Sequence, residues 1–137
     1  IDTGASIGEE FEAVRAAWSA GHDFFFVHVK KTDSCGEDGD LAGKAKVIEE
    51  VDRFLPLLLE LKPDVIIVTG DHSTPCALKG HSWHPVPFLL RSDACGADAA
   101  RSFSEIECDR GALGVFPAAS IMELALANAG RLRKHGA

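Results

Sequence analysis

Long apolar runs are absent from this 137-residue sequence, and no stretch approaches the roughly 18 to 20 apolar residues that a membrane-spanning helix needs. The first residues, IDTGASIGEE, have neither the basic start nor the apolar core of a signal peptide. We therefore expect no membrane segment and a cytoplasmic location. The sequence also lacks an initial methionine, so we expect it to be a piece of a longer protein.

Basic residues are scarce as well. The sequence has 14 Lys and Arg against 21 Asp and Glu, which gives a formal net charge of -7. This balance argues against a nucleic-acid partner, because phosphate backbones require a basic face. It remains compatible with a small phosphorylated substrate, since bound divalent cations reverse the local sign of the charge.

Closely spaced cysteines are missing too. The four cysteines lie far apart and form no CxxC pair, which makes a disulfide framework improbable. Hydrophobic residues make up 46% of the chain, and its length is that of one domain with a buried core. We expect a single globular domain.

Four helices are expected, and apolar spacing and end signals locate three of them. Residues 9–20 place Phe11, Val14 and Ala17 on one face, and Gly21 is a plausible left-handed end. A second helix is expected over residues 41–61, with a bend at Pro56 because proline removes a backbone donor. The last helix is expected to begin near Pro117 or Ala118 and to end with the basic residues Arg131, Arg133, Lys134 and His135.

Three apolar runs predict strands at residues 24–30, 65–69 and 86–90. The run from Val65 to Val68 is continuously β-branched or apolar, which is typical of a parallel strand covered on both faces. Because strands alternate with helices, we expect an α/β fold with a mainly parallel sheet flanked by helices, in which the first two strands are neighbours.

Candidate metal ligands follow two of these strands. Asp71 and His72 come directly after the second strand, and His81 follows nine residues later. The segment KTDSCGEDGD follows the first strand and brings Asp33 and Glu37, four residues apart. Carboxylates and neutral imidazoles are good ligands for Zn and Mn, and such groups converge at the carboxyl ends of parallel strands.

Each candidate also has a simpler interpretation. Asp71 and His72 could be a turn-capping acid and an exposed histidine, His81 a loop histidine, and Glu37 a solvated loop acid. Ser73 and Thr74 are expected to hydrogen-bond the turn after the strand.

Taken in order, HVKKTDSCGEDGD, VTGDHSTP, KGHSWHPVPFLL and FSEIECDRGALG resemble the carboxyl-terminal part of cofactor-independent phosphoglycerate mutase of the archaeal type, in the alkaline phosphatase superfamily. The resemblance runs essentially the whole chain. It implies part of an alkaline-phosphatase-like layered fold, residues 1–137 being one portion of a metal-dependent phosphatase or mutase domain.

The resemblance implies two divalent metal ions, with Mn or Zn expected and Mg as an alternative. One would be bound by Asp33, Glu37 and His81, and the other by Asp71 and His72 together with an aspartate and the phosphate-accepting serine outside this chain. The family usually has histidine where this chain has Glu37, and this difference bears on metal choice. No catalytic nucleophile is expected within the chain.

The implied function is a glycolytic isomerase that interconverts 3-phosphoglycerate and 2-phosphoglycerate through a phosphoserine enzyme. Two alternatives remain open: another phosphatase or phosphopentomutase of the same superfamily, and a non-catalytic metal-binding domain. The isolated chain is expected to lack mutase activity, because no residue in it matches the family's nucleophile.

Overall fold

The computed structural model describes residues 6–132 and divides them into two compact units. We call residues 6–63 and 74–82 the helical unit, and residues 64–73 and 83–132 the hairpin unit.

The first helix of the helical unit, α1 (Ile7–Ser19), begins two residues earlier than expected because Ser6 and Glu9 form a capping box. The Ser6 hydroxyl accepts from the Glu9 amide at 3.3 Å, and the Glu9 carboxylate accepts from the Ser6 amide at 3.2 Å. These bonds satisfy amides that lack partners at a helix start. Gly21 follows the helix with a φ of 86°, as expected.

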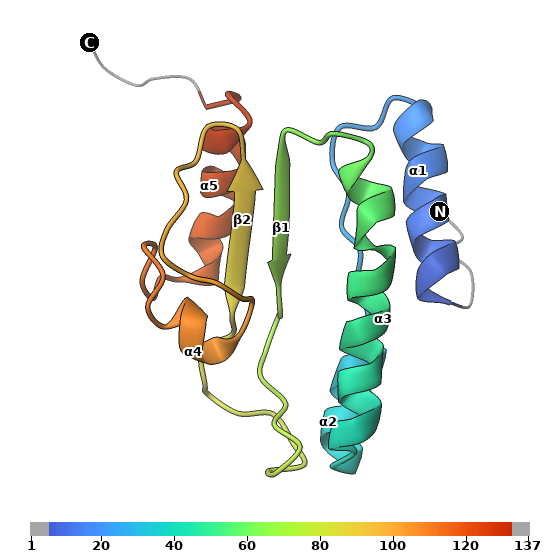
Figure 1. Ribbon diagram of the computed structural model, residues 1–137, viewed down its shortest axis with the longest axis vertical. Helices are drawn as coiled ribbons and strands as arrows, with labels where there is room; N and C mark the ends of the chain where they lie inside the picture. Colours follow the sequence, from blue (N-terminus) through green and yellow to red (C-terminus); the bar gives the residue numbers. More distant parts are fainter. Residues whose placement is uncertain (1–5, 133–137) are drawn as a thin grey trace. The chain divides into compact units, whose positions relative to one another are not determined.

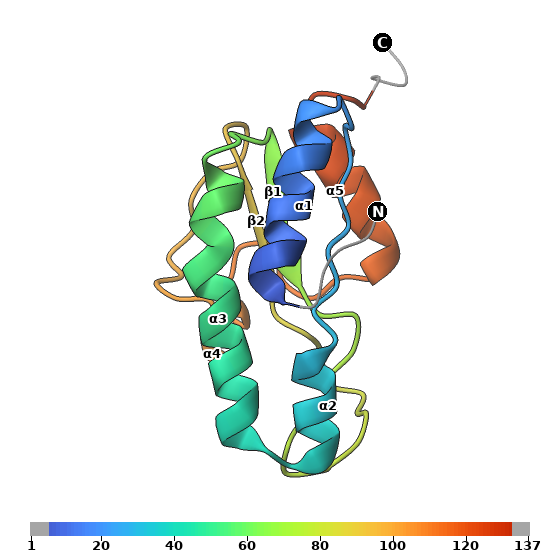
Figure 2. The same ribbon diagram turned by 90° about the vertical axis from the view of Figure 1, so that its right-hand side faces the viewer.

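The longest helix, α3 (Leu41–Leu59), packs against the other two helices of the unit, with α1 along its later part and α2 along its earlier part (Figure 2). Asp40 caps its start by accepting from the Gly43 amide at 2.8 Å, and the helix continues through Pro56. Phe11 on α1 is only 3% exposed. Burial of a phenylalanine side chain stabilises a fold by about 1.5 to 3 kcal/mol.

The segment KTDSCGEDGD forms a helix that the sequence did not predict, α2 (Lys31–Asp38). It ends at Gly39, whose φ is 74°, and the Asp40 amide donates to the Cys35 carbonyl at 2.8 Å. These features end the helix, because the bonds of the last turn satisfy the final carbonyl groups of α2.

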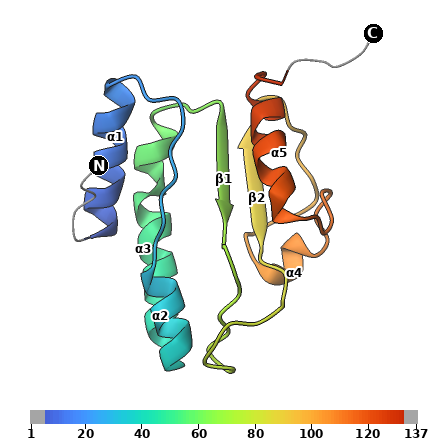
Figure 3. The same cartoon turned by 180° about the vertical axis from the view of Figure 1, so that it is seen from behind.

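The predicted strand at residues 24–30 is wrong: residues 22–29 form neither helix nor strand (Figure 3). A strand requires a hydrogen-bonded neighbour, and only β1 and β2 form a sheet within residues 6–132. Phe24 and Phe26 remain 63% and 78% exposed.

The hairpin unit is built on β1 (Val65–Thr69) and β2 (Phe88–Ser92), which pair antiparallel with Val65 opposite Ser92 and Thr69 opposite Phe88 (Figure 1). The strand at residues 65–69 is confirmed, and the one expected at residues 86–90 begins two residues later. A parallel sheet is not seen in the described part of the chain. Residues 70–87 contain no crossover helix, and parallel pairing needs a crossover to return the chain to its starting end.

Three short helical elements complete this unit: α4 (Glu105–Cys108), a 3-10 turn η1 (Ala118–Ser120), and α5 (Ile121–Asn128), which packs against the strands (Figure 3). The Ser92 hydroxyl donates to Asn128 Oδ1 at 2.8 Å and ties β2 to α5.

At the start predicted for the last helix, near Pro117 or Ala118, the chain forms the 3-10 turn η1, and α5 begins three residues later at Ile121. The helix ends before Gly130, whose φ is 66°. The expectation that Arg131 belongs to its last turn is therefore wrong, and Arg133, Lys134 and His135 lie outside the described residues. The fold is mixed α/β. None of the helices in residues 6–132 combines the length and apolar character that crossing a bilayer requires.

Candidate metal centre

Asp33, in the first turn of α2, is the most enclosed of the predicted ligands, at 8% exposure. Its Oδ1 accepts a hydrogen bond from the Thr74 hydroxyl at 2.6 Å. Its Oδ2 forms an ion pair with the Lys30 ammonium group, one turn earlier in the chain. Both oxygens are therefore held by neighbouring side chains, which fixes the plane of the carboxylate.

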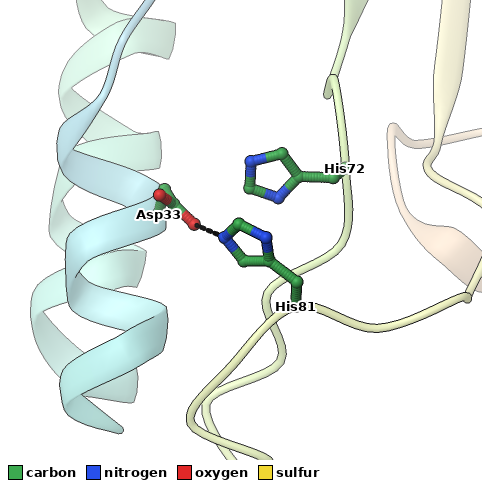
Figure 4. Close-up of side chains that lie close together, drawn as sticks. All are labelled: Asp33, His72 and His81. Atoms are coloured by element: carbon green, nitrogen blue, oxygen red, sulfur yellow. Dashed lines mark ion pairs between the residues drawn. The ribbon is translucent and has the colours of Figure 1, made fainter.

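His81 lies beside this carboxylate. Its Nε2 is 3.5 Å from Asp33 Oδ1, an ion pair drawn in Figure 4, and 3.8 Å from Glu37 Oε1. Asp33 and Glu37 share one face of α2 because residues four apart are neighbours on a helix. The helical unit thus brings together all three residues predicted to bind the first ion.

The geometry of these donors fits a divalent cation. Metal bonds to His and carboxylate ligands are about 2.0 to 2.2 Å long, so neighbouring donors around one ion stand about 3 to 3.5 Å apart. The separations of 3.5 and 3.8 Å are close to this spacing. The His81 and Glu37 side chains are 57% and 53% exposed, so both have room to adjust.

The other two predicted ligands belong to the hairpin unit and follow β1. His72 Nε2 lies 3.6 Å from Asp71 Oδ2, and the His72 amide donates to Asp71 Oδ1 at 3.2 Å. The Asp71 side chain is 62% exposed. This pair offers one carboxylate and one imidazole, fewer donors than a closed metal site requires. The ligand roles of all five residues stay predictions.

Sequence reasoning missed the part that Thr74 plays. Its hydroxyl donates to the Asp33 carboxylate on α2, 41 residues away. Nothing in the spacing of the sequence could reveal this contact, because it depends on how α2 packs.

Two groups of the hairpin unit have displaced pKa values. Backbone amides of Ala100 and Ala112 donate to the Asp98 carboxylate at 2.9 and 3.1 Å and lower its pKa. Hydrogen bonds from Ser92 lower the pKa of the Cys95 thiol. Both shifts follow from donors that stabilise the charged form.

Comparison with known proteins gives a consistent family. The model of the metalloenzyme superfamily matches residues 2–128. Proteins named probable 2,3-bisphosphoglycerate-independent phosphoglycerate mutase match from Thermosipho melanesiensis (59% identity over 100% of this chain), Aquifex aeolicus (54% over 98%) and Thermus thermophilus (49% over 98%). The chain spans only 33% to 34% of the length of these relatives.

The fold also matches a solved structure, that of the PH0037 protein from Pyrococcus horikoshii. The TM-score is 0.91 at 32% identity, over 96% of this chain and 41% of that one. The resemblance inferred from the sequence motifs is thereby confirmed.

Proposed function

The chain belongs to the metalloenzyme superfamily, and from this premise we propose that it forms the carboxyl-terminal part of a metal-dependent phosphoglycerate mutase. The reaction is the interconversion of 3-phosphoglycerate and 2-phosphoglycerate. Support comes from relatives that carry this name and match the whole length of the chain at 52% to 59% identity.

The observation that carries the proposal is the cluster of Asp33, Glu37 and His81. His81 Nε2 lies 3.5 Å from Asp33 Oδ1 and 3.8 Å from Glu37 Oε1, so the three residues supply two carboxylates and one imidazole. Three protein donors suit a catalytic site, which keeps a coordination position for substrate or water. Mn or Zn is the expected ion, because both accept mixed oxygen and nitrogen ligands.

We assign Asp71 and His72 to a second ion, whose remaining ligands come from the part of the relatives that this chain does not match. We also assign the mainly parallel sheet and the cytoplasmic location to that larger protein. A pair of divalent ions would make a serine hydroxyl more acidic and offset the negative charge of the transferred phosphoryl group.

The residues of this chain hold the Asp33 carboxylate in place and balance its charge. The Asp33 carboxylate is buried and paired with Lys30, so it can hold a cation without first reorganising. Lys30 places a positive charge beside the carboxylate and limits the repulsion between Asp33 and Glu37.

An exchange of segments tests this function. The matching third of the Thermosipho melanesiensis relative is replaced by this chain, and the isomerisation of 3-phosphoglycerate is measured with and without a chelator. We expect turnover that the chelator removes and Mn²⁺ restores. His81→Ala in the exchanged protein should reduce turnover at least about 100-fold, since the loss of even an outer partner of a metal ligand costs about 10- to 100-fold.

His84→Ala is the matched control, because His84 is the next histidine along the chain and stacks on Trp83 at 4.9 Å. It should retain turnover. A folded, metal-binding exchange protein without turnover would favour a binding domain. Release of phosphate without isomerisation would favour a phosphatase.

A further inference from the structure

The buried hydroxyl of Thr74 makes a contact that the proposed function does not explain. Thr74 is 4% exposed and donates to Asp33 Oδ1 at 2.6 Å. An ionised carboxylate only accepts hydrogen bonds, so the hydroxyl must be the donor. The distance is typical of a charge-assisted hydrogen bond, which is about twice as strong as a neutral one.

Two features of the helical unit hold Thr74 in place. The Lys44 ammonium group on α3 donates to the Thr74 carbonyl at 2.8 Å. The backbone of α2 comes so close at Gly36 that an added Cβ would lie 2.3 Å from the Thr74 carbonyl oxygen and 2.9 Å from Thr74 Cγ2. Thr74 is thus fixed by α2 and α3 before any ion binds.

The two oxygens of the Asp33 carboxylate have different partners. Lys30 holds Oδ2, while Thr74 holds Oδ1, the oxygen that faces His81 Nε2 at 3.5 Å. A carboxylate oxygen has two lone-pair directions, so Oδ1 can accept from Thr74 and still bind a cation. Thr74 therefore sets the direction in which Oδ1 is presented.

We propose that Thr74 is a positioning residue that orients the Asp33 carboxylate for a divalent cation through its hydroxyl. This inference rests on the proposed function, in which Asp33 is a metal ligand. It assigns to Thr74 no contact with substrate or metal.

The test compares four variants of the chain by calorimetry with Mn²⁺, each at a temperature well below its melting point. Thr74→Val keeps the shape of the side chain and removes the hydroxyl, and it should weaken Mn²⁺ binding about 10- to 100-fold. Thr74→Ser keeps the hydroxyl and should stay within about threefold of the original chain. Thr74→Ala compared with Thr74→Ser isolates the hydroxyl again, should Thr74→Val fail to fold. Asp33→Asn should remove the binding.

A double-mutant cycle of melting temperatures, measured without metal, tests whether Thr74 and Asp33 are coupled. Thr74→Val should lower the melting temperature clearly in the original chain but much less in Asp33→Asn, because its partner is then already altered. Full Mn²⁺ affinity in both Thr74→Val and Thr74→Ala, with binding lost in Asp33→Asn, would overturn the positioning role and leave the proposed ligand intact. Unchanged Mn²⁺ affinity in Asp33→Asn would instead overturn the proposed metal site. Additive melting effects in the cycle would overturn the coupling between Thr74 and Asp33.

Discussion

The helical unit and the hairpin unit each contain predicted metal ligands, but they surround them differently. All the buried apolar side chains among residues 6–132 belong to the helical unit: Ile7, Phe11, Ala17 and Cys35. There Asp33 is enclosed and bonded on both oxygens, whereas the Asp71 side chain in the hairpin unit is 62% exposed and contacts its neighbour His72. A ligand held by packing and hydrogen bonds keeps its geometry, so the helical unit is the better prepared to bind an ion.

Removal of one histidine from each unit tests this difference in metal binding most directly. His81→Ala should weaken the strongest Mn²⁺ binding of the isolated chain at least about 100-fold, because it removes one of three clustered donors. His72→Ala should change that binding less than about threefold. Calorimetry on both variants measures the difference, and equal losses would mean that the two units do not differ as described.

A smaller effect is expected at Glu37, whose side chain is 53% exposed. Glu37→His should raise the ratio of Zn²⁺ to Mn²⁺ affinity about tenfold, because imidazole suits Zn²⁺ while carboxylates suit harder cations. Glu37→Gln keeps the size of the side chain without its charge and should weaken both ions. Competition between the two ions, followed by calorimetry, gives the ratio. Unchanged affinities in both variants would remove Glu37 from the site.

The smallest effect concerns the hairpin unit alone. Folding lowers the Asp98 pKa below its ordinary value of 3.8 through the amides of Ala100 and Ala112. The resulting stabilisation is present above that value and is lost as the pH falls through the lower folded-state pKa. Melting temperatures between about pH 6 and pH 2 should therefore decline less in Asp98→Asn than in the original chain. Parallel curves would show that the carboxylate contributes nothing to stability.

Elements whose signal lies within their own residues could be predicted from the sequence. The Val65 to Val68 run specified β1, and the apolar face around Phe11 specified α1, because both signals lie within one element. Residues 24–30 are equally apolar but form no strand, since strand formation depends on a hydrogen-bonded partner elsewhere in the chain. Helix α2 was missed because its Asp, Ser and Gly residues read as a loop, and its end is fixed by Gly39.

The residues of the candidate metal site also differ in how well the sequence predicts them. Spacing and family resemblance identified Asp33, Glu37 and His81, and the structure brings these three together. Thr74 could not be found, because its contact with Asp33 spans 41 residues and requires the close approach of Gly36. A residue that hydrogen-bonds a metal ligand is harder to identify from the sequence than the ligand itself.

The exposed aromatic residues of the helical unit affect how the isolated chain behaves at high concentration. The six residues FFFVHV carry no charged side chain at neutral histidine, and Phe24 and Phe26 are largely exposed. Such uncharged, β-prone hexapeptides are the segments that stack into intermolecular sheets, and flanking charges suppress this. Asp23 precedes the segment and Lys30 and Lys31 follow it, but Lys30 is engaged with Asp33. Asp23 and Lys31 are therefore the flanking residues whose replacement should most readily cause the isolated chain to precipitate.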